Sequence, residues 1–376
     1  MMKDVFIVSD NILSPLGATT DENFEQLIKN ISGVTQHNNG DLSDQPFYAS
    51  LFSDRHQFLK DGAGYTKFEQ LLIASITTAL SSIEIDITGK KTVLIISTTK
   101  GNISLLETEA ESPQLNSRMA LHASAKLIAQ KFQFANQPVL VSHACISGLV
   151  ALITGMRLLQ SGQYENAVVA GADVISKFVL SGFQSFQAIS GAPCKPFDAA
   201  RDGINLGEGA GTVILSSNRA YAQGIKIAAG AVSNDANHIS GPSRTGEELC
   251  HAINTALSGA NLTAKDIDLI SAHGTATIYN DDMEAKAITL ANMQAIPVNG
   301  LKGFYGHTLG ASGLIEVIVS ARSLKRGIIL PTKGFKQQDT VNPLNICSEL
   351  QSRQLNNCLK IASGFGGCNA AMVLSK

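Results

Sequence analysis

The stretch VLVSHACISGLVAL, residues 139–152, changes character at a cysteine. Before Cys145 a short apolar run is typical of a buried strand, and after it apolar residues recur at helical spacing. A cysteine at such a junction is either a small buried hydrophobic residue or a nucleophile whose thiolate the helix N-terminus favours. The stretch alone does not distinguish these two interpretations, so the other segments of the chain must be weighed with it.

The same order of strand and helix recurs along the chain. Runs rich in Val and Ile predict strands at 5–9, 92–97, 138–142, 166–172 and 211–216. Apolar residues three and four positions apart predict helices at 68–80, 148–162, 247–258, 281–292 and 311–325. This alternation predicts an α/β fold with largely parallel sheets covered by helices. We expect two similar βαβ halves, 1–220 and 221–376, with the site where their loops meet, and a surface excursion at 35–63.

Composition excludes several classes of protein. The chain has 376 residues, 44% of them hydrophobic and 16% charged, which describes a compact globular protein. A net charge of −2 gives no sign of a nucleic-acid surface. No apolar stretch approaches a membrane span, and the first residues do not resemble a signal peptide. The six cysteines are therefore expected to be reduced thiols in a cytoplasmic protein.

Four glycine-flanked segments end predicted strands and carry the candidate chemistry. They are SHACISG, SAHGTAT, LKGFYGHTLGASG and SGFGGCNAA. Cys145 would be the nucleophile, while His273 and His307 could move a proton or stabilise developing charge. Lys302 adds a fixed positive charge, and the GFGG turn offers backbone N–H groups for an oxyanion hole. Together these groups are the parts of an acyl-transfer site.

With PFDAARDGINLGEGAG, these segments resemble the 3-oxoacyl-[acyl-carrier-protein] synthases, the condensing enzymes with a Cys-His-His site. The resemblance covers nearly the whole chain and implies a thiolase-like fold with a layered α-β-α-β-α core. It implies that Cys145 takes an acyl group from the phosphopantetheine of an acyl carrier protein as a thioester. Malonyl-carrier protein would then lose carbon dioxide and attack that thioester, with His273 and His307 stabilising the enolate. No metal or organic cofactor is implied.

The resemblance also implies supporting roles. Lys302 would hold the charge balance of the two histidines, with Glu284 as its partner, and Asp281 would cap the helix that follows His273. The N–H groups of Cys145 and Phe365 would form the oxyanion hole, and Phe365 would gate the acyl pocket. The residues expected to contact substrate are Thr275 and Thr277 on the pantetheine arm, with Ile146 and Gly366. His238 is expected near the site without an assigned step.

Two departures from the family pattern bear on the substrate. Ile146 follows the nucleophile where the family usually carries a small residue. The segment between Gly101 and Cys145 is also short for the family. Both features would reshape the acyl pocket, and they favour a specialised pathway, such as polyketide or aryl-polyene synthesis, over ordinary fatty-acid elongation.

Two rival interpretations remain open. A thiolase would share the loop around His307 and would use Cys368 as a second thiol, but it would not need the HGTAT histidine or Lys302. A partner subunit like the chain-length factors would share the fold, although such subunits lose the nucleophile. The resemblance implies a homodimer, or a heterodimer with a homologous synthase, whose seam is the strand before Cys145. Lys67 and Lys195 are candidates for docking the acidic carrier protein.

Overall fold

The computed structural model describes residues 3–53, 64–221, 224–236 and 241–376. Its main feature is an 11-stranded sheet that runs through the whole molecule. In spatial order its strands are β13 (Asn345–Ile346), β11 (Pro297–Gly300), β10 (Leu269–Ala272), β15 (Asn357–Gly364), β16 (Cys368–Ser375), β9 (Lys226–Asn234), β1 (Phe6–Leu13), β8 (Gly209–Ser216), β6 (Asn166–Asp173), β4 (Thr92–Ser97) and β5 (Val139–Val141).

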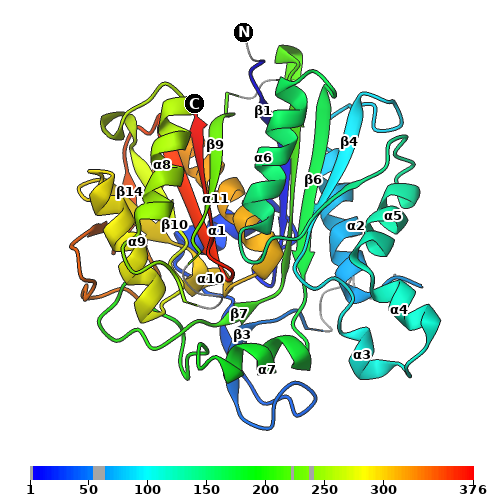
Figure 1. Ribbon diagram of the computed structural model, residues 1–376, viewed down its shortest axis with the longest axis horizontal. Helices are drawn as coiled ribbons and strands as arrows, with labels where there is room; N and C mark the ends of the chain where they lie inside the picture. Colours follow the sequence, from blue (N-terminus) through cyan, green and yellow to red (C-terminus); the bar gives the residue numbers. More distant parts are fainter. Residues whose placement is uncertain (1–2, 54–63, 222–223, 237–240) are drawn as a thin grey trace.

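Helices cover the outer faces of this sheet, and others lie between its two halves (Figure 1). They are α1 (Thr20–Ile28), α2 (Lys67–Leu80), α3 (Leu105–Thr108), α4 (Pro113–Met119), α5 (Leu121–Lys131), α6 (Ser147–Gln160), α7 (Lys177–Ser185), α8 (Glu247–Gly259), α9 (Ile278–Leu290), α10 (Lys302–Tyr305) and α11 (Ser312–Arg326). The strands and helices expected from the sequence are present, with ends displaced by a few residues.

The two halves of the sheet repeat one topology. In the first half the spatial order is β1-β8-β6-β4-β5, and in the second it is β9-β16-β15-β10-β11. In both, the chain-order numbers of the strands read 1-5-4-2-3, with two antiparallel pairings followed by two parallel ones. The halves join where β1 pairs with β9 at Phe6 and Lys226. The expected α/β fold with two similar halves is confirmed, while a boundary between residues 220 and 221 stays a prediction. The expectation of a largely parallel sheet is wrong, because β1, β8, β9 and β16 pair antiparallel in the middle of the sheet and half of its described pairings are antiparallel.

Two helices occupy the middle layer. α6 packs against β4, β6, β9 and β16, and α11 packs against β8, β15 and α6. On the outer faces, α2 and α5 cover the first half, and α8 and α9 cover the second (Figure 1). Apolar side chains from both halves meet around α6 and α11 in the largest core cluster. This order of helices and sheets is the expected α-β-α-β-α core.

The middle helices cross closely because glycines face each other at their first turns. A Cβ at Gly148 would lie 2.8 Å from the Leu314 nitrogen, and one at Gly313 would lie 2.6 Å from the Leu149 nitrogen. Real Cβ atoms do not approach backbone atoms so closely, so both positions need glycine for the helices to touch. The contact brings the start of α6, which follows Cys145, against the start of α11, which follows His307.

A second, smaller sheet corrects one expectation. β2 (Thr35–His37), β3 (Phe47–Ser50) and β7 (Leu206–Gly207) form a three-stranded sheet near α7. Phe47 and Ala49 are buried in a cluster with α7 residues, so this part of 35–63 is not a surface excursion. Residues 54–63 of that segment lie outside the described residues. A two-stranded sheet of β12 (Ile328–Ile329) and β14 (Gln351–Ser352) completes the strands described.

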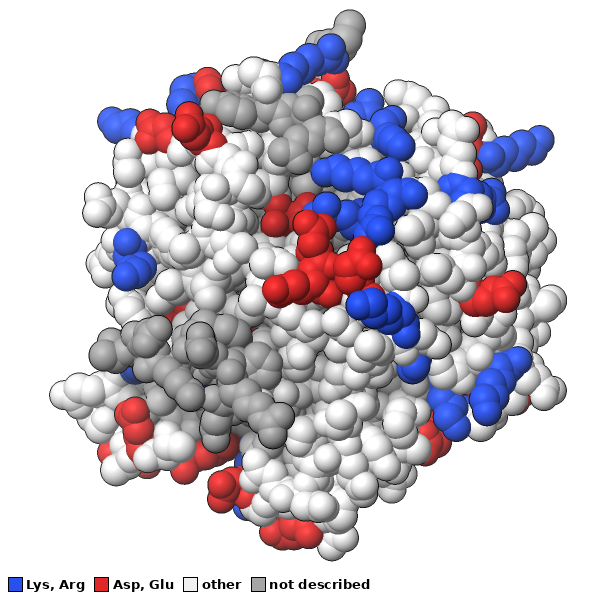
Figure 2. Space-filling view, turned by 180° about the vertical axis from the view of Figure 1, so that it is seen from behind, with Lys and Arg blue, Asp and Glu red and all other residues white. Residues whose placement is uncertain are grey.

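On the rear face, acidic and basic side chains lie next to each other (Figure 2). The ion pairs between α1 and α11 join Arg322 to Asp21 and Arg326 to Glu25. Opposite charges therefore compensate one another where these two helices meet. Among the described residues, none of the helices is long and apolar enough to cross a membrane.

Candidate active site

Cys145 lies between the end of β5 and the start of α6, and it is buried with 8% of its surface exposed. Ala144 directly before it has a φ of 45°, a left-handed conformation that costs a non-glycine residue energy. The Ser147 hydroxyl closes this turn, because it donates to the Ala144 carbonyl and accepts from the His143 N–H. The strained turn aims the thiol inward, beneath the loops of the second half.

The surroundings of Cys145 oppose ionisation. Burial raises the pKa of its thiol to about 11, although the Lys302 charge and the Phe365 N–H act in the opposite direction. A helix N-terminus contributes only about 0.3 to 1 kcal/mol in favour of an anion, which is less than the cost of burying one. Burial therefore outweighs the expected preference of the α6 N-terminus for a thiolate, and the resting group at neutral pH is a thiol.

His273 and His307 lie beside this thiol. His273 follows β10 and His307 follows α10, and their ring centroids are 5.3 Å apart with the rings nearly perpendicular. One ring nitrogen of each histidine and the Cys145 sulfur all lie within 4.8 Å of one another. The structure therefore brings together the three residues that the sequence predicted, although Cys145 lies more than a hundred residues before the two histidines in the chain.

Both histidines are neutral at physiological pH. Burial lowers the pKa of His273 and of His307 well below the ordinary value, and the positive charge of Lys302 lowers both further. Neither ring nitrogen of His307 has a hydrogen-bond partner among the residues that the structure describes. A neutral imidazole with free nitrogens can accept a proton from the thiol or donate a hydrogen bond to an oxyanion.

Lys302 is fully buried, and its ammonium donates to the His273 carbonyl at 2.5 Å. The same nitrogen lies 3.1 Å from His273 Nδ1 and 2.8 Å from Glu316 Oε1. The expected pairing with Glu284 is wrong, because the Lys302 ion pair is formed with Glu316 of α11. Glu316 comes after Lys302 in the chain and reaches it because α11 runs through the middle layer.

Glu284 and Asp281 hold the loop after His273 instead. Glu284 accepts from the N–H groups of His273 and Gly274 at 2.6 and 2.7 Å. Asp281 accepts from the N–H groups of Thr275 and Phe197, which lie in two different loops. The expectation that Asp281 caps α9 is therefore wrong. Burial raises the pKa of Asp281 to about 7, with the Glu284 charge as the second cause. Both carboxyl groups therefore set the position of the His273 loop.

The turn that contains Phe365 covers the thiol. The Phe365 N–H forms a hydrogen bond that lowers the pKa of Cys145, so this backbone donor lies beside the thiol. The Phe365 ring is 37% exposed and lies 5.7 Å from Phe183 and 5.3 Å from Phe186, between ring centroids. Gly366 follows it with a φ of 86°, which favours glycine. An aromatic cluster therefore stands at the mouth of the site.

The other predicted contact residues lie on either side. Ile146 is fully buried in the central core cluster, at the first turn of α6. The hydroxyl groups of Thr275 and Thr277 are 2.8 Å apart in the loop after His273. Of the two candidate docking lysines, Lys67 forms an ion pair with the buried Glu208, and Lys195 is half-buried. His238 lies outside the described residues.

Several residues of the site were missed from the sequence. Two backbone hydrogen bonds hold His307: its N–H donates to the Asn205 carbonyl, and its carbonyl accepts from the Gly207 N–H. Asn205 and Gly207 belong to the RDGINLGEGAG block. Glu316 and Lys360 are fully or nearly fully buried, and they form an ion pair at 2.6 Å. Each is a charged residue within an apolar run, SGLIEVIVS and NCLKIAS, and that pattern was the available signal.

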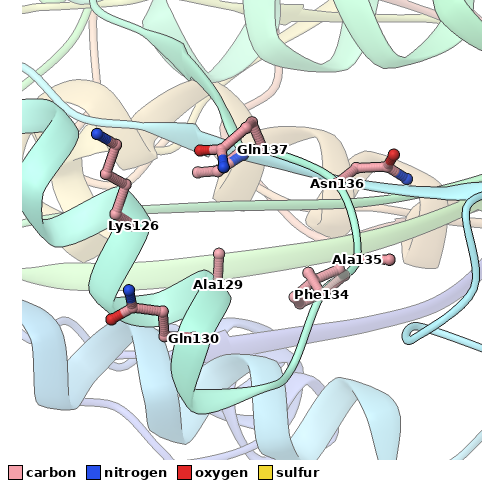
Figure 3. Close-up of a pocket in the computed structure, with 8 residues that line it drawn as sticks. Lys126, Ala129, Gln130, Phe134, Ala135, Asn136 and Gln137 are labelled. Carbon is pink, nitrogen blue, oxygen red and sulfur yellow. The ribbon is translucent and has the colours of Figure 1, made fainter.

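Two surface hollows lie away from Cys145. The first lies between α5 and the loop that leads into β5 (Figure 3). The second lies beside the start of α9 and is lined by Ala199, Arg201, Ile278, Asp282 and residues 339–341. The first borders β5, which is one of the two edge strands of the large sheet in the described part of the chain.

A buried thiol beside two neutral histidines, at the junction of two repeated α/β halves, is an arrangement that suits acyl transfer through a cysteine thioester. Family models describe the class more closely. The model named Beta-ketoacyl synthase, N-terminal domain, matches residues 2–220, and the C-terminal domain model matches residues 225–336. The chain belongs to the beta-ketoacyl synthase family, whose members are acyltransferases of the condensing type.

Individual relatives agree with this assignment. The chain is 31% identical to a putative polyketide beta-ketoacyl synthase 1 from Streptomyces halstedii, over 70% of this chain and 66% of that protein. It is 28% identical to 3-oxoacyl-[acyl-carrier-protein] synthase 2 from Staphylococcus aureus strain N315, over 100% of this chain and 98% of that protein.

Solved structures share the fold. The ishigamide ketosynthase/chain length factor superposes with a TM-score of 0.90 at 24% identity, and it covers 100% of both chains. A type II polyketide ketosynthase in complex with its acyl-carrier protein gives 0.87 at 20% identity, also over 100% of both chains. These similarities show that the chain has the thiolase-like fold.

Proposed function

We propose that this protein elongates an acyl chain by decarboxylative condensation of malonyl-carrier protein with an acyl group held on Cys145. The observation that carries the proposal is the buried cluster of Cys145, His273 and His307, whose reactive atoms lie within 4.8 Å of one another. Family membership supports it, and the intact nucleophile favours catalysis over the partner-subunit alternative. The products would be fatty-acid or polyketide and aryl-polyene chains.

In the first half-reaction, the Cys145 sulfur attacks the thioester of an acyl-carrier protein. Because the pKa of the thiol is about 11, its proton must pass to a neighbouring base as the carbon–sulfur bond forms. His307 is suited to accept it, since its ring is neutral and both nitrogens are free of partners among the described residues. The proton then goes to the departing pantetheine thiol, and the N–H groups of Cys145 and Phe365 bind the oxyanion.

In the second half-reaction, the carbon–carboxylate bond of the malonyl group breaks and carbon dioxide leaves. The electron pair forms an enolate whose oxygen accepts hydrogen bonds from His273 and His307. The enolate carbon attacks the acyl carbon, and the Cys145 sulfur departs and regains a proton. Lys302 holds His273 in place, and Thr275 and Thr277 contact the pantetheine arm.

The partners follow from this chemistry. The substrates arrive on acyl carrier protein, and a structural relative is known in complex with its own carrier protein. We expect Lys195 to contribute more than Lys67 to docking, because the buried Glu208 already neutralises Lys67. A homodimer, or a heterodimer with a homologous synthase, would form along β5. A cytoplasmic location and the lack of any metal or organic cofactor belong to the same proposal.

Intact-protein mass spectrometry tests the proposal. The wild type and Cys145→Ala are incubated with acyl-carrier proteins of several chain lengths. An adduct of acyl mass on the wild type alone supports the proposal, and the preferred chain length indicates the pathway. The absence of any adduct, with malonyl-carrier protein present and absent, contradicts it. Condensation from acetyl-coenzyme A without malonyl input would instead favour a thiolase.

A further inference from the structure

A second lysine is buried beneath the active site. Lys360 lies on β15 within an apolar run and has no exposed surface. Its ammonium is 2.6 Å from Glu316 Oε2, and it donates to the carbonyl groups of Ser271 and Ala272 at 3.2 and 2.9 Å. An ammonium buried in this way is costly unless its partners compensate it. Lys360 therefore depends on Glu316 and on the carbonyl groups next to His273 to compensate its charge.

Lys360 and Lys302 share one carboxylate. Glu316 faces Lys302 with Oε1 and Lys360 with Oε2, and the Ser312 hydroxyl donates to Oε1 at 3.1 Å. The two ammonium groups together donate to the carbonyls of three consecutive residues, 271 to 273. The carbonyl groups at the end of β10 and at His273, which follows it, are thus bound by two ammonium groups that share the Glu316 carboxylate.

This arrangement determines the orientation of the His273 ring. An ammonium has donors and no acceptor, so His273 Nδ1 must accept from Lys302, and the ring proton then lies on Nε2. Glu284 binds the N–H groups of His273 and Gly274 from the other side. Both the backbone and the tautomer of His273 are therefore determined by charged groups behind it.

We propose that Lys360 is a positioning residue for decarboxylation: through Glu316, Lys302 and the carbonyls at the end of β10, it holds His273 with its Nε2–H directed at the enolate oxygen. The inference deepens the proposed function and rests on it. Lys360 itself touches no substrate, since two residues, Glu316 and Lys302, stand between it and the imidazole ring.

The charges behind the histidines give this proposal a pH-dependent consequence. Burial is the main reason why the pKa of both histidines lies below its ordinary value, and Lys302 and Lys360 each lower it further. Removing one cation raises the pKa of the histidines. A histidine that works in its neutral form becomes protonated and inactive as the pH falls, and in the variant this loss would begin at a higher pH than in the wild type. The groups around His273 that bear on this titration are Cys145, Glu284, Lys302, His307, Glu316 and Lys360.

The test uses full-length Lys360→Met, which keeps the bulk of the side chain and removes its charge. Release of carbon dioxide from malonyl-carrier protein is measured from about pH 5 to about pH 9. We expect the decarboxylation rate at its optimum to fall about 10-fold and the acidic limb of the profile to move to higher pH. Acylation of Cys145 at neutral pH should change less than about 2-fold, because Lys360 contacts neither His307 nor the oxyanion hole and because burial and Lys302 still keep the pKa of His307 low.

Arg322→Met is the matched control. Arg322 is on the same helix as Glu316, and it forms ion pairs with Asp10 of β1 and Asp21 of α1. This variant removes a cation from α11 without touching the Lys302 network, so its pH profile should coincide with that of the wild type. A folded Lys360→Met protein that acylates normally and keeps the wild-type decarboxylation profile overturns the proposal.

The ring tautomer provides a second test that needs no variant. In the wild type labelled with ¹⁵N-histidine, the His273 resonances should report a proton on Nε2 and an acceptor at Nδ1. A proton on Nδ1 overturns the proposal even where Lys360→Met fails to fold. Failure of the proposed function is distinguishable, because it would appear as wild-type protein without an acyl adduct, whatever the tautomer.

Discussion

At the scale of single residues, burial outweighs the features that usually activate a cysteine. Cys145 stands at a helix N-terminus and near Lys302, yet the pKa of its thiol is raised to about 11. The Cys145 thiolate is therefore rare in the resting enzyme at neutral pH, and the thiol must lose its proton as its sulfur attacks the substrate. The neutral histidines are suited to this task because they can accept the proton within the same buried space.

This pKa predicts how alkylation depends on pH. Because only the thiolate reacts, the rate of iodoacetamide labelling at Cys145 should rise about tenfold per pH unit and show no plateau near pH 9, where an ordinary thiol is ionised. Peptide mapping by mass spectrometry measures the rate at this one site, and Cys145→Ser serves as the blank. A plateau below pH 9 would mean that the site stabilises the thiolate after all.

A carboxylate far from the thiol offers a second prediction. Glu69 on α2 is fully buried and forms an ion pair with Arg118 of α4. Burial raises the pKa of Glu69, but hydrogen bonds from Arg118, Asn102 and Ser124 outweigh it and lower the pKa overall. The ion pair therefore stabilises the fold above the ordinary pKa of a carboxyl group, and this stabilisation is lost as the pH falls.

Arg118→Met should lower the free energy of unfolding by about 2 to 3 kcal/mol at pH 7, because it leaves Glu69 buried without a cation. Part of Arg118 is exposed, which keeps the effect below that of a wholly buried pair. The difference from the wild type should shrink towards pH 4, where Glu69 becomes protonated in the variant. Urea unfolding at both pH values measures it, and a difference independent of pH would contradict this account.

At the scale of elements, the crossing of α6 and α11 sets the distance between the two halves of the site. Cys145 precedes one helix and His307 precedes the other, and the helices touch through Gly148 and Gly313. Interiors are packed too tightly to absorb an added methyl group at such a contact. A change here should therefore affect both the stability of the fold and the geometry of the site.

Gly313→Ala should destabilise the protein by about 1 to 3 kcal/mol, because its Cβ would lie 2.6 Å from the Leu149 nitrogen. Gly182→Ala is the matched control, since it lies in α7 and a Cβ there meets nothing within 4 Å. That second substitution should stabilise the protein by up to about 1 kcal/mol through helix propensity. Urea unfolding measures both variants. If Gly313→Ala and Gly182→Ala changed the free energy of unfolding equally, the close contact of α6 and α11 would not be the reason for glycine at position 313.

At the scale of the whole molecule, the large sheet ends in an unpaired edge. β5 is its last strand in the described part of the chain, and β4 is its neighbour on one side only. Thr98 donates to the Val141 carbonyl, so the polar groups of Val141 face β4 and, by alternation, those of Leu140 face the open edge. An edge of this kind is a template for pairing with another chain.

We proposed a dimer that forms along β5. Leu140→Pro should convert that dimer into a monomer, because it removes an N–H from the open edge and leaves the β4 ladder intact. Leu140→Val keeps the N–H and should remain dimeric. Native mass spectrometry of both variants and the wild type measures the change. A folded Leu140→Pro protein that stays dimeric would place the interface elsewhere.

Local patterns predicted much of this protein. The alternation of apolar runs and helical periods indicated the α/β fold, because strand and helix periods depend on neighbouring residues. Glycine-flanked strand ends indicated Cys145, His273 and His307, since loops at the carboxyl ends of parallel strands meet at one edge of a sheet. Burial of β3 was missed because its partner strand, β7, is more than 150 residues away in the chain.

The sequence by itself determined the main strands and helices and indicated the residues that we propose carry the chemistry. The tertiary structure alone decided how those residues are charged and which partners they have. Lys302 pairs with Glu316 and not with Glu284, and Cys145 is a thiol and not a thiolate. Only the structure shows that Lys360 is connected to the site, through its ion pair with Glu316. Ion pairs and pKa values depend on burial and on distances of a few ångströms between segments far apart in the chain. No local pattern contains those distances.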